Sequence, residues 1–265
     1  MPWLGFGVYQ NYDARPSVLE AFKAGYRHVD SAQVYRNEDA VGAAVRDAET
    51  LGLKREDLFI TTKCVSKTHG YEKTLKGVDE SLAKFGFSYI DLFLIHDPYS
   101  GKELRLQTYK ALLEAKTAGK IRSVGVSNYG VHHLKEIAEA GYDAPTINQI
   151  ELHPFCQQKP IVEYCIANSI VVQAYCPIIR GEDKYLNNDS IKKLAAKHDR
   201  TAAQVLLRWS LQKGYVPLPK SATPSRIHEN TKLYDFELTA EDMAALDALD
   251  RGKDGAISWN PVDAP

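Results

Sequence analysis

Short apolar segments alternate with longer amphipathic segments along most of the chain. Most of the apolar runs are continuous rather than alternating, which is typical of strands that are covered on both faces. They predict eight strands, at residues 5–9, 27–31, 58–63, 90–96, 121–127, 146–151, 170–175 and 215–219.

The segments between these runs carry apolar residues at helical spacing. Residues 72–85 have one apolar stripe, and Gly86 is suited to end that helix in a left-handed conformation. Pro16 marks the start of an earlier helix. Thr239, with Asp242 three residues later, resembles a capping box and predicts the start of a late helix.

Alternating strands and helices predict an α/β fold, and eight repeats predict a parallel (β/α)8 TIM barrel. We expect residues 1–265 to form one domain, since no linker or large repeat interrupts the pattern. The rival is an open doubly wound sheet, which should carry a glycine-rich turn after its first strand. No G-x-G-x-x-G motif occurs in the sequence, so the barrel is favoured.

Composition narrows the class of protein without indicating its chemistry. Apolar residues make up 44% of the chain and charged residues 25%, which excludes disordered and low-complexity proteins. The net charge of −1 argues against nucleic acid as a partner, and no apolar run is long enough to cross a membrane. Four cysteines without a C-x-x-C pair predict reduced thiols rather than a metal site. With no secretory signal visible, we expect a cytoplasmic monomer that binds no metal.

Polar, titratable or aromatic residues stand at the carboxyl ends of seven predicted strands. In a barrel these ends meet at one rim, where active sites are built, so the set is more informative than any single member. The residues are Asp30, Lys63, His96, the pair Ser127 and Asn128, Gln149, Tyr175 and Lys220.

Four of the residues near this rim form a chemically coherent group. Lys63 and His96 end apolar strands, so their polar groups need partners beside the barrel core. Asp30 is the natural counter-ion for Lys63, and Tyr35 lies in the loop five residues beyond Asp30. Together they can supply an acid, a charged group that tunes it, a counter-ion and an orienting imidazole.

Six separated motifs that contain these residues resemble those of the aldo-keto reductase family, in order and over nearly the whole chain. Residues 30–38 (DSAQVYRNE) resemble its signature around the catalytic Asp and Tyr, and 62–63 (TK) and 94–98 (LIHDP) resemble those of its Lys and His. The cofactor motifs are similar to 125–128 (GVSN), 147–151 (INQIE) and 219–221 (PKS) followed by 226–230 (RIHEN).

The resemblance implies reduction of an aldehyde or ketone by hydride transfer from NADPH, which becomes NADP+. It makes Tyr35 the general acid, Lys63 its tuner, Asp30 the partner of Lys63 and His96 the residue that orients the carbonyl. A nearby ammonium favours phenolate, so we expect Lys63 to bring the pKa of Tyr35 from about 10 toward neutral pH. The partner is then a small carbonyl compound.

The resemblance also implies a set of coenzyme-binding residues. Ser127, Asn128 and Gln149 suit the nicotinamide carboxamide, and Tyr175 can stack on the ring. Lys220, Ser221 and Arg226 place two cations and a hydroxyl where NADPH carries its 2′-phosphate. The remaining members of the set are Pro177, Arg180, Glu229 and Asn230, of which the last two are suited to the adenine.

The chain departs from the family pattern at several positions. Cys176 stands where relatives often have Ser, which puts a pyrophosphate contact from that side chain in doubt. Val65 and Asp97 stand where relatives often have Trp, so we expect a wide, polar substrate pocket lined by these two residues with Tyr9 and Tyr99. The usual N-terminal hairpin and long C-terminal tail are expected to be absent or short.

Three other functions remain as alternatives. A Schiff-base aldolase would use Lys63 but leaves the cationic motif around Arg226 unexplained. A metal-dependent hydrolase would draw on Asp30, His96, Asp97 and His153, although no H-x-H pair is present. A coenzyme-bound regulatory subunit without turnover is disfavoured because all four catalytic positions are filled.

Overall fold

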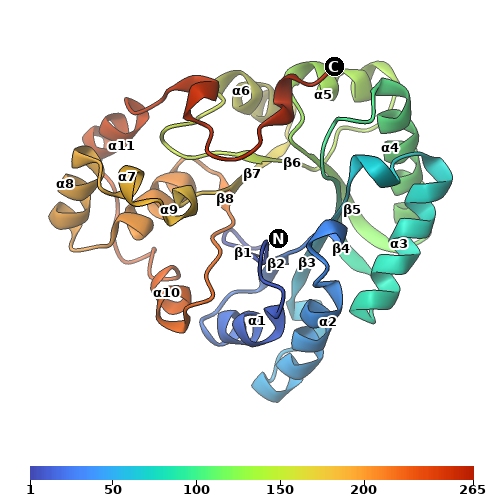
Figure 1. Ribbon diagram of the computed structural model, residues 1–265, viewed down its shortest axis with the longest axis horizontal. Helices are drawn as coiled ribbons and strands as arrows, with labels where there is room; N and C mark the ends of the chain where they lie inside the picture. Colours follow the sequence, from blue (N-terminus) through green and yellow to red (C-terminus); the bar gives the residue numbers. More distant parts are fainter.

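The computed structural model describes residues 1–265 and forms a ring of eight parallel strands surrounded by helices (Figure 1). The strands pair in sequence order from first to last. They are β1 (Phe6–Gly7), β2 (His28–Asp30), β3 (Phe59–Cys64), β4 (Ile90–Ile95), β5 (Ile121–Ser127), β6 (Ile147–Glu151), β7 (Val171–Tyr175) and β8 (Val216–Pro217).

Eleven α-helices follow or connect these strands. They are α1 (Ala14–Lys23), α2 (Glu38–Asp47), α3 (Tyr71–Phe85), α4 (Lys102–Thr117), α5 (Val131–Glu139), α6 (Lys159–Ala167), α7 (Asp183–Leu186), α8 (Asp189–His198), α9 (Ala202–Gln212), α10 (Pro224–Glu229) and α11 (Ala240–Asp247). The predicted (β/α)8 barrel is therefore confirmed. None of the helices is long and apolar enough to cross a membrane.

The ring closes where the shortest strands meet. The backbone amides of Gly5 and Gly7 donate hydrogen bonds of 3.0 and 2.9 Å to the carbonyls of Pro217 and Pro219. Strands β1 and β8 are only two residues long, although the sequence predicted five in each. Two prolines in the last strand lack the N–H that a regular ladder requires, which accounts for its shortness.

Local signals set several helix ends as predicted. Helix α3 ends before Gly86, which has φ 72° in the left-handed region. Thr239 and Asp242 form the capping box of α11, with each backbone amide bound by the other side chain. Helix α1 begins at Ala14, so Pro16 lies within its first turn rather than at its start.

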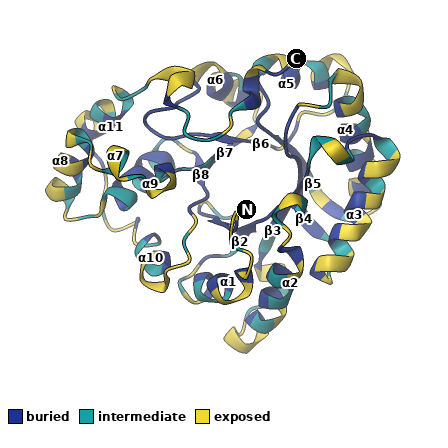
Figure 2. Cartoon of the chain, viewed as in Figure 1, coloured by how far each residue is buried: buried dark blue, intermediate teal, exposed yellow.

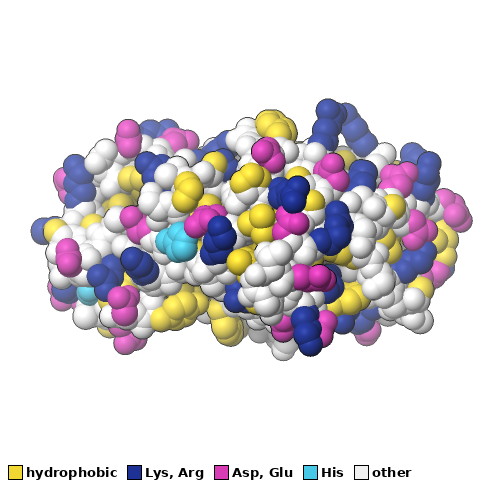
Figure 3. Space-filling model, turned by 90° about the horizontal axis from the view of Figure 1, so that it is seen from below, with side chains coloured by type: hydrophobic (Ala, Val, Ile, Leu, Met, Phe, Trp, Pro, Cys, Tyr) yellow, Lys and Arg dark blue, Asp and Glu magenta, His cyan; other side chains and the backbone are white.

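Apolar side chains fill the space between the strands and the helices, where one cluster holds 52 buried residues. A separate small cluster of Leu92, Leu94 and Ile147 lies inside the ring. Figure 2 shows buried residues along the strands and exposed residues on the outer faces of the helices. Acidic and basic side chains are intermixed on the face seen in Figure 3. The buried strands thus carry apolar side chains together with a few hydrogen-bonded polar ones, such as His28 with Thr61, and charged side chains lie at their carboxyl ends, where Asp30 and Lys63 form an ion pair.

Candidate active site

A cavity of about 780 Å³ opens at the carboxyl ends of the strands, a size suited to a small-molecule ligand or cofactor. It brings together most of the residues singled out in the sequence. The predicted residues that line it are Tyr9, Asp30, Tyr35, Val65, His96, Ser127, Asn128, Gln149, Tyr175, Pro177, Arg180, Lys220, Ser221, Arg226, Glu229 and Asn230.

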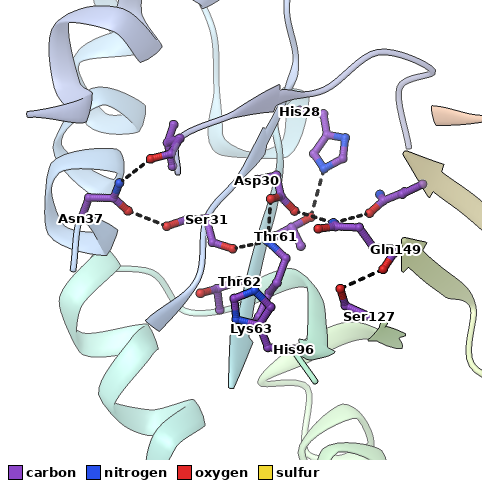
Figure 4. Close-up of polar contacts among 12 residues, drawn as sticks. His28, Asp30, Ser31, Asn37, Thr61, Thr62, Lys63, His96, Ser127 and Gln149 are labelled. Carbon is purple, nitrogen blue, oxygen red and sulfur yellow. Dashed lines mark hydrogen bonds and ion pairs between the residues drawn. The ribbon is translucent and has the colours of Figure 1, made fainter. Parts of the chain in front are cut away.

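Asp30, which lines this cavity, forms a buried ion pair with Lys63 (Figure 4). The Nζ of Lys63 is 2.5 Å from Oδ1 of Asp30 and donates a second hydrogen bond of 2.9 Å to the carbonyl of Ser31. The other carboxylate oxygen of Asp30 accepts a hydrogen bond of 2.8 Å from Nε2 of Gln149. Burial lowers the pKa of Lys63, while Asp30 opposes this shift.

Tyr35 lies directly beside the ion pair, at the end of a short 3-10 turn over Gln33–Tyr35. Lys63 Nζ is 5.1 Å from the centre of its ring. Asn37, buried two residues later, donates to the carbonyls of Val8 and Asn11 and fixes the loop against the first strand.

The electrostatics of Tyr35 differ from the sequence-based expectation. Burial, with a smaller effect from Asp30, raises the pKa of Tyr35 well above 10 rather than bringing it toward neutral pH. The main cause is burial of the phenol, which disfavours the charged phenolate, and the nearby Asp30 carboxylate adds to the shift. The phenol therefore stays protonated at neutral pH and is available as a proton donor.

His96 is placed edge-on to Tyr35, with their ring centres 5.7 Å apart. Burial, and then the charge of Lys63, lowers the pKa of His96 well below 6.5, so the imidazole is neutral. Its Nδ1 has no hydrogen-bond partner in the protein. A neutral imidazole in the cavity wall can donate or accept one hydrogen bond without adding charge.

Hydroxyl and amide groups of β5, β6 and β7 form the wall next to the ion pair. Asn128, in a left-handed conformation, donates from Nδ2 to the carbonyl of His96 and accepts from the hydroxyl of Tyr175 at 2.8 Å. Ser127 Oγ donates to the carbonyl of Gln149 at 2.8 Å. These bonds hold the predicted amide and aromatic groups in fixed positions around one part of the cavity.

Cationic side chains lie at the part of the cavity formed by the loop after β8 and by α10. Lys220 and Arg226 line it and are exposed, and neither forms an ion pair with the protein. Glu229 accepts a hydrogen bond from the hydroxyl of Thr201 and forms no ion pair with Arg226. Two unpaired cations on one wall favour an anionic group of a ligand.

Comparison with known proteins agrees with this geometry. Residues 4–251 match the model of the aldo/keto reductase family. The chain belongs to the aldo/keto reductase family. Its sequence is 42% identical over 264 residues to the glyoxal reductase of Bacillus subtilis, covering 98% of this chain and 92% of the relative.

Solved structures of the family superimpose over nearly the whole chain. MGS-M4, an aldo-keto reductase from a deep-sea metagenome library, has a TM-score of 0.94 at 38% identity, covering 100% of this chain and 96% of that chain. An aldo-keto reductase of Bombyx mori in complex with NADP has a TM-score of 0.89 at 34% identity, covering 95% and 90%.

The expected substrate residues of this aldo-keto reductase divide into two pairs. Tyr9 and Val65 line the cavity, whereas Asp97 and Tyr99 are not among the lining residues. The Asp97 carboxylate is buried and accepts hydrogen bonds from the backbone amides of Ser66 (3.1 Å) and Tyr99 (3.2 Å). The Asp97 side chain therefore does not make the cavity wall polar, because its carboxylate is bound to backbone amides of two loops.

Trp259 lines the cavity, although the sequence did not predict it as a site residue. It lies far beyond the last strand, yet its ring packs against His96 and Tyr99, with centres 6.0 and 5.6 Å away. No local pattern identifies it, since its position depends on how the C-terminal segment crosses the barrel. Cys176 also lines the cavity. It stands where relatives often have Ser, which put a pyrophosphate contact from this side chain in doubt.

The geometry does not support the two other enzyme functions. Lys63 is fully buried, is held by Asp30 and does not line the cavity, so it is not placed to form a Schiff base. Asp97 binds backbone amides and His153 binds Glu151, so neither joins Asp30 and His96 around one point.

Proposed function

We propose that this aldo-keto reductase reduces aldehydes or ketones to alcohols with NADPH. The observation that carries the proposal is the buried Lys63–Asp30 pair beside Tyr35 and His96, in a cavity that also contains the unpaired cations of Lys220 and Arg226. A proton donor and a phosphate-binding region thus share one cavity.

Tyr35 is the proposed proton donor. A carbonyl oxygen that becomes an alkoxide is a stronger base than a phenolate, so it can take the proton from a phenol whose pKa is raised. The O–H bond of Tyr35 breaks as the new O–H bond of the alcohol forms. The Lys63 ammonium, 5.1 Å from the ring centre, then stabilises the phenolate that remains.

His96 is proposed to orient the carbonyl. Because the imidazole is neutral, it directs the substrate oxygen toward Tyr35 through a hydrogen bond and does not compete as the acid. Asp30 has no contact with substrate in this scheme, and it keeps the ammonium of Lys63 in place from below. Fixed donors of this kind contribute mainly by preorganisation.

The residues of the cavity fit a nicotinamide coenzyme, and the size of the cavity agrees with this. When bound, NADPH supplies the hydride that reduces the carbonyl carbon. Ser127, Asn128 and Gln149 are proposed to hold its carboxamide, and Tyr175 is proposed to pack on its ring. The residues proposed for the rest of the coenzyme are Pro177 and Arg180 along the loop after β7, Lys220, Ser221 and Arg226 for the 2′-phosphate, and Glu229 and Asn230 for the adenine.

A panel of carbonyl compounds tests the proposal directly. Purified protein is mixed with NADPH and each compound, including a nitrobenzaldehyde and methylglyoxal, and the absorbance of NADPH is followed. Substrate-dependent loss of NADPH absorbance with formation of the alcohol is the expected result. Tight binding of NADPH without turnover of any carbonyl would instead favour a coenzyme-bound regulatory subunit.

We propose the cytoplasm as the location of the protein. All four of its cysteines are free, in keeping with this location.

A further inference from the structure

We propose that Glu151 is a positioning residue that determines substrate selectivity. It does so by fixing the C-terminal segment that carries Trp259, so that the indole forms one wall of the substrate site. Glu151 is not one of the four residues proposed for catalysis, and it does not line the cavity. The inference rests on the proposed carbonyl reduction, because it concerns which carbonyl compounds that reaction accepts.

Glu151 is fully buried at the end of β6 and has no Lys or Arg partner. Its Oε1 accepts hydrogen bonds from the backbone amide of Ile257 at 2.6 Å and from Nε2 of His153 at 3.0 Å. Its Oε2 accepts from the backbone amide of Ser258 at 3.1 Å. Two of the three donors to this buried carboxylate thus belong to the segment next to Trp259.

The neighbouring strand binds the next residue of the same segment. Tyr175 is the register partner of Glu151, and its hydroxyl lies 3.0 Å from the carbonyl of Trp259, so its single proton is shared between this carbonyl and Oδ1 of Asn128. Three successive residues, 257 to 259, are therefore held by two adjacent strand ends. Figure 1 shows the red C-terminal segment crossing the β6–β7 side of the ring toward α5.

The indole of Trp259 depends on these backbone contacts for its position. The residue remains 43% exposed, so packing covers only part of it. Its ring nevertheless lies beside His96, which we propose to orient the carbonyl. An aromatic or other flat apolar group next to the carbonyl would contact the indole, whereas a small dicarbonyl would not reach it.

A double-mutant cycle tests whether Glu151 acts through Trp259. Variants Glu151→Gln, Trp259→Ala and the double variant are assayed with a nitrobenzaldehyde and with methylglyoxal. Each single variant is expected to raise the ratio of the two KM values, aromatic over small, by about tenfold, the upper size of one lost aromatic contact. The double variant should match Trp259→Ala within about twofold, because residues acting as a unit are not additive.

Additive effects in the cycle would overturn the proposal, as would equal losses with both substrates. Asp91→Asn is the control, since Asp91 is also a buried carboxylate that accepts from a backbone amide, that of Ile60, but lies at the opposite end of the barrel, where it also pairs with Arg55 and Arg122. It should leave the KM ratio unchanged. A shift of the ratio in this control equal to that of Glu151→Gln would show that general loosening of the barrel is responsible.

A second variant covers the case in which Glu151→Gln does not fold. A Cβ at Gly255 would lie 1.7 Å from the carbonyl oxygen of Phe155, so Gly255→Ala must separate the C-terminal segment from the loop at Phe155. It should raise the same KM ratio as Glu151→Gln, and an unchanged ratio would contradict the proposal.

Fluorescence separates this proposal from the proposed function. In a Trp3→Phe background the remaining indoles are fully buried Trp209 and half-exposed Trp259. Acrylamide quenching should rise at least twofold in Glu151→Gln and stay constant in Asp91→Asn, whether or not any carbonyl is reduced. Unchanged quenching in Glu151→Gln would show that Glu151 does not fix Trp259.

Discussion

Lys63 and Asp30 form an ion pair from which water is nearly excluded. Their side chains are 0% and 6% exposed, and Nζ lies 2.5 Å from Oδ1. The pair lies where β2 and β3 end inside the barrel, so both charges act on whatever binds above them. Desolvation makes the pair sensitive to the loss of either partner, because the remaining charge cannot be hydrated.

Asp30→Asn should lower the free energy of unfolding by about 3–5 kcal/mol, since it leaves the Lys63 ammonium buried without a counter-ion. The double variant Asp30→Asn/Lys63→Met removes both charges and should recover part of this stability, but none of the activity. Urea unfolding and carbonyl reduction measure the two effects. Asp79→Asn, which breaks the exposed pair with Lys120, is the control and should cost about 1 kcal/mol or less. A double variant less stable than Asp30→Asn would contradict this account of the pair.

The pH dependence of the reduction should reflect the shifted pKa values of Tyr35 and His96. The acid must be protonated, and the pKa of Tyr35 is raised, so activity should decline only above about pH 10. The pKa of His96 is lowered, so the imidazole should add no titration between about pH 6.5 and 9. The profile of kcat/KM against pH is therefore expected to be flat in this range. A midpoint near pH 7 that is lost in Tyr35→Phe would show that Lys63 lowers the pKa of Tyr35 after all.

Stability should fall in mild acid because of a buried histidine below the active site. Burial lowers the pKa of His28 to about 3, so the unfolded chain binds a proton near pH 6.5 and the folded chain does not. The contribution of His28 to stability is thus fully present above about pH 6.5 and should decrease by about 1.4 kcal/mol per unit as the pH falls toward 5. The other buried histidines whose pKa is lowered, His69, His96 and His133, add to the total slope. His28→Gln should reduce that slope in urea unfolding, whereas replacing half-exposed His228 should not. An identical slope in His28→Gln would refute the assignment.

The barrel and most of the cavity could be predicted from the sequence because their signals are local. Continuous apolar runs indicate strands covered on both faces, and residues such as Lys63 and His96 at their ends must meet at one rim. The lengths of β1 and β8, two residues each, were overestimated from the sequence, because hydrophobicity does not report that Pro217 and Pro219 lack a backbone N–H.

Other features of the site depend on the three-dimensional arrangement of residues that are distant in sequence. The raised pKa of Tyr35 follows chiefly from how deeply the folded barrel buries its phenol, which the sequence does not report. Asp97 was expected to face substrate because of its position after His96, but its carboxylate turns to the amides of Ser66 and Tyr99. Trp259 lines the cavity on a segment that Glu151 and Tyr175 bind, and no sequence spacing reveals these contacts.

Arg226 should determine the preference for NADPH over NADH. Arg226→Ala is expected to raise the KM for NADPH by about ten- to a hundredfold, the equivalent of a charge-assisted hydrogen bond of roughly 1.5–3 kcal/mol. The KM for NADH should change little, since NADH lacks the 2′-phosphate. Lys232→Ala removes an exposed cation that does not line the cavity and should leave both values unchanged. Equal weakening of both coenzymes in Arg226→Ala would place Arg226 away from the phosphate.

The role of Tyr35 as the acid is the central claim, and single-turnover reduction by Tyr35→Phe tests it most directly. Single turnover is required because product release can limit steady-state rates. The rate of NADPH oxidation should fall by about 10²–10⁴-fold, the usual loss when a general acid is removed. The Kd for NADPH, from its fluorescence, should stay within about twofold of the wild-type value, since the phenol is not assigned to the coenzyme. A Tyr35→Phe variant that binds NADPH normally and keeps more than about a tenth of the wild-type rate would contradict the account.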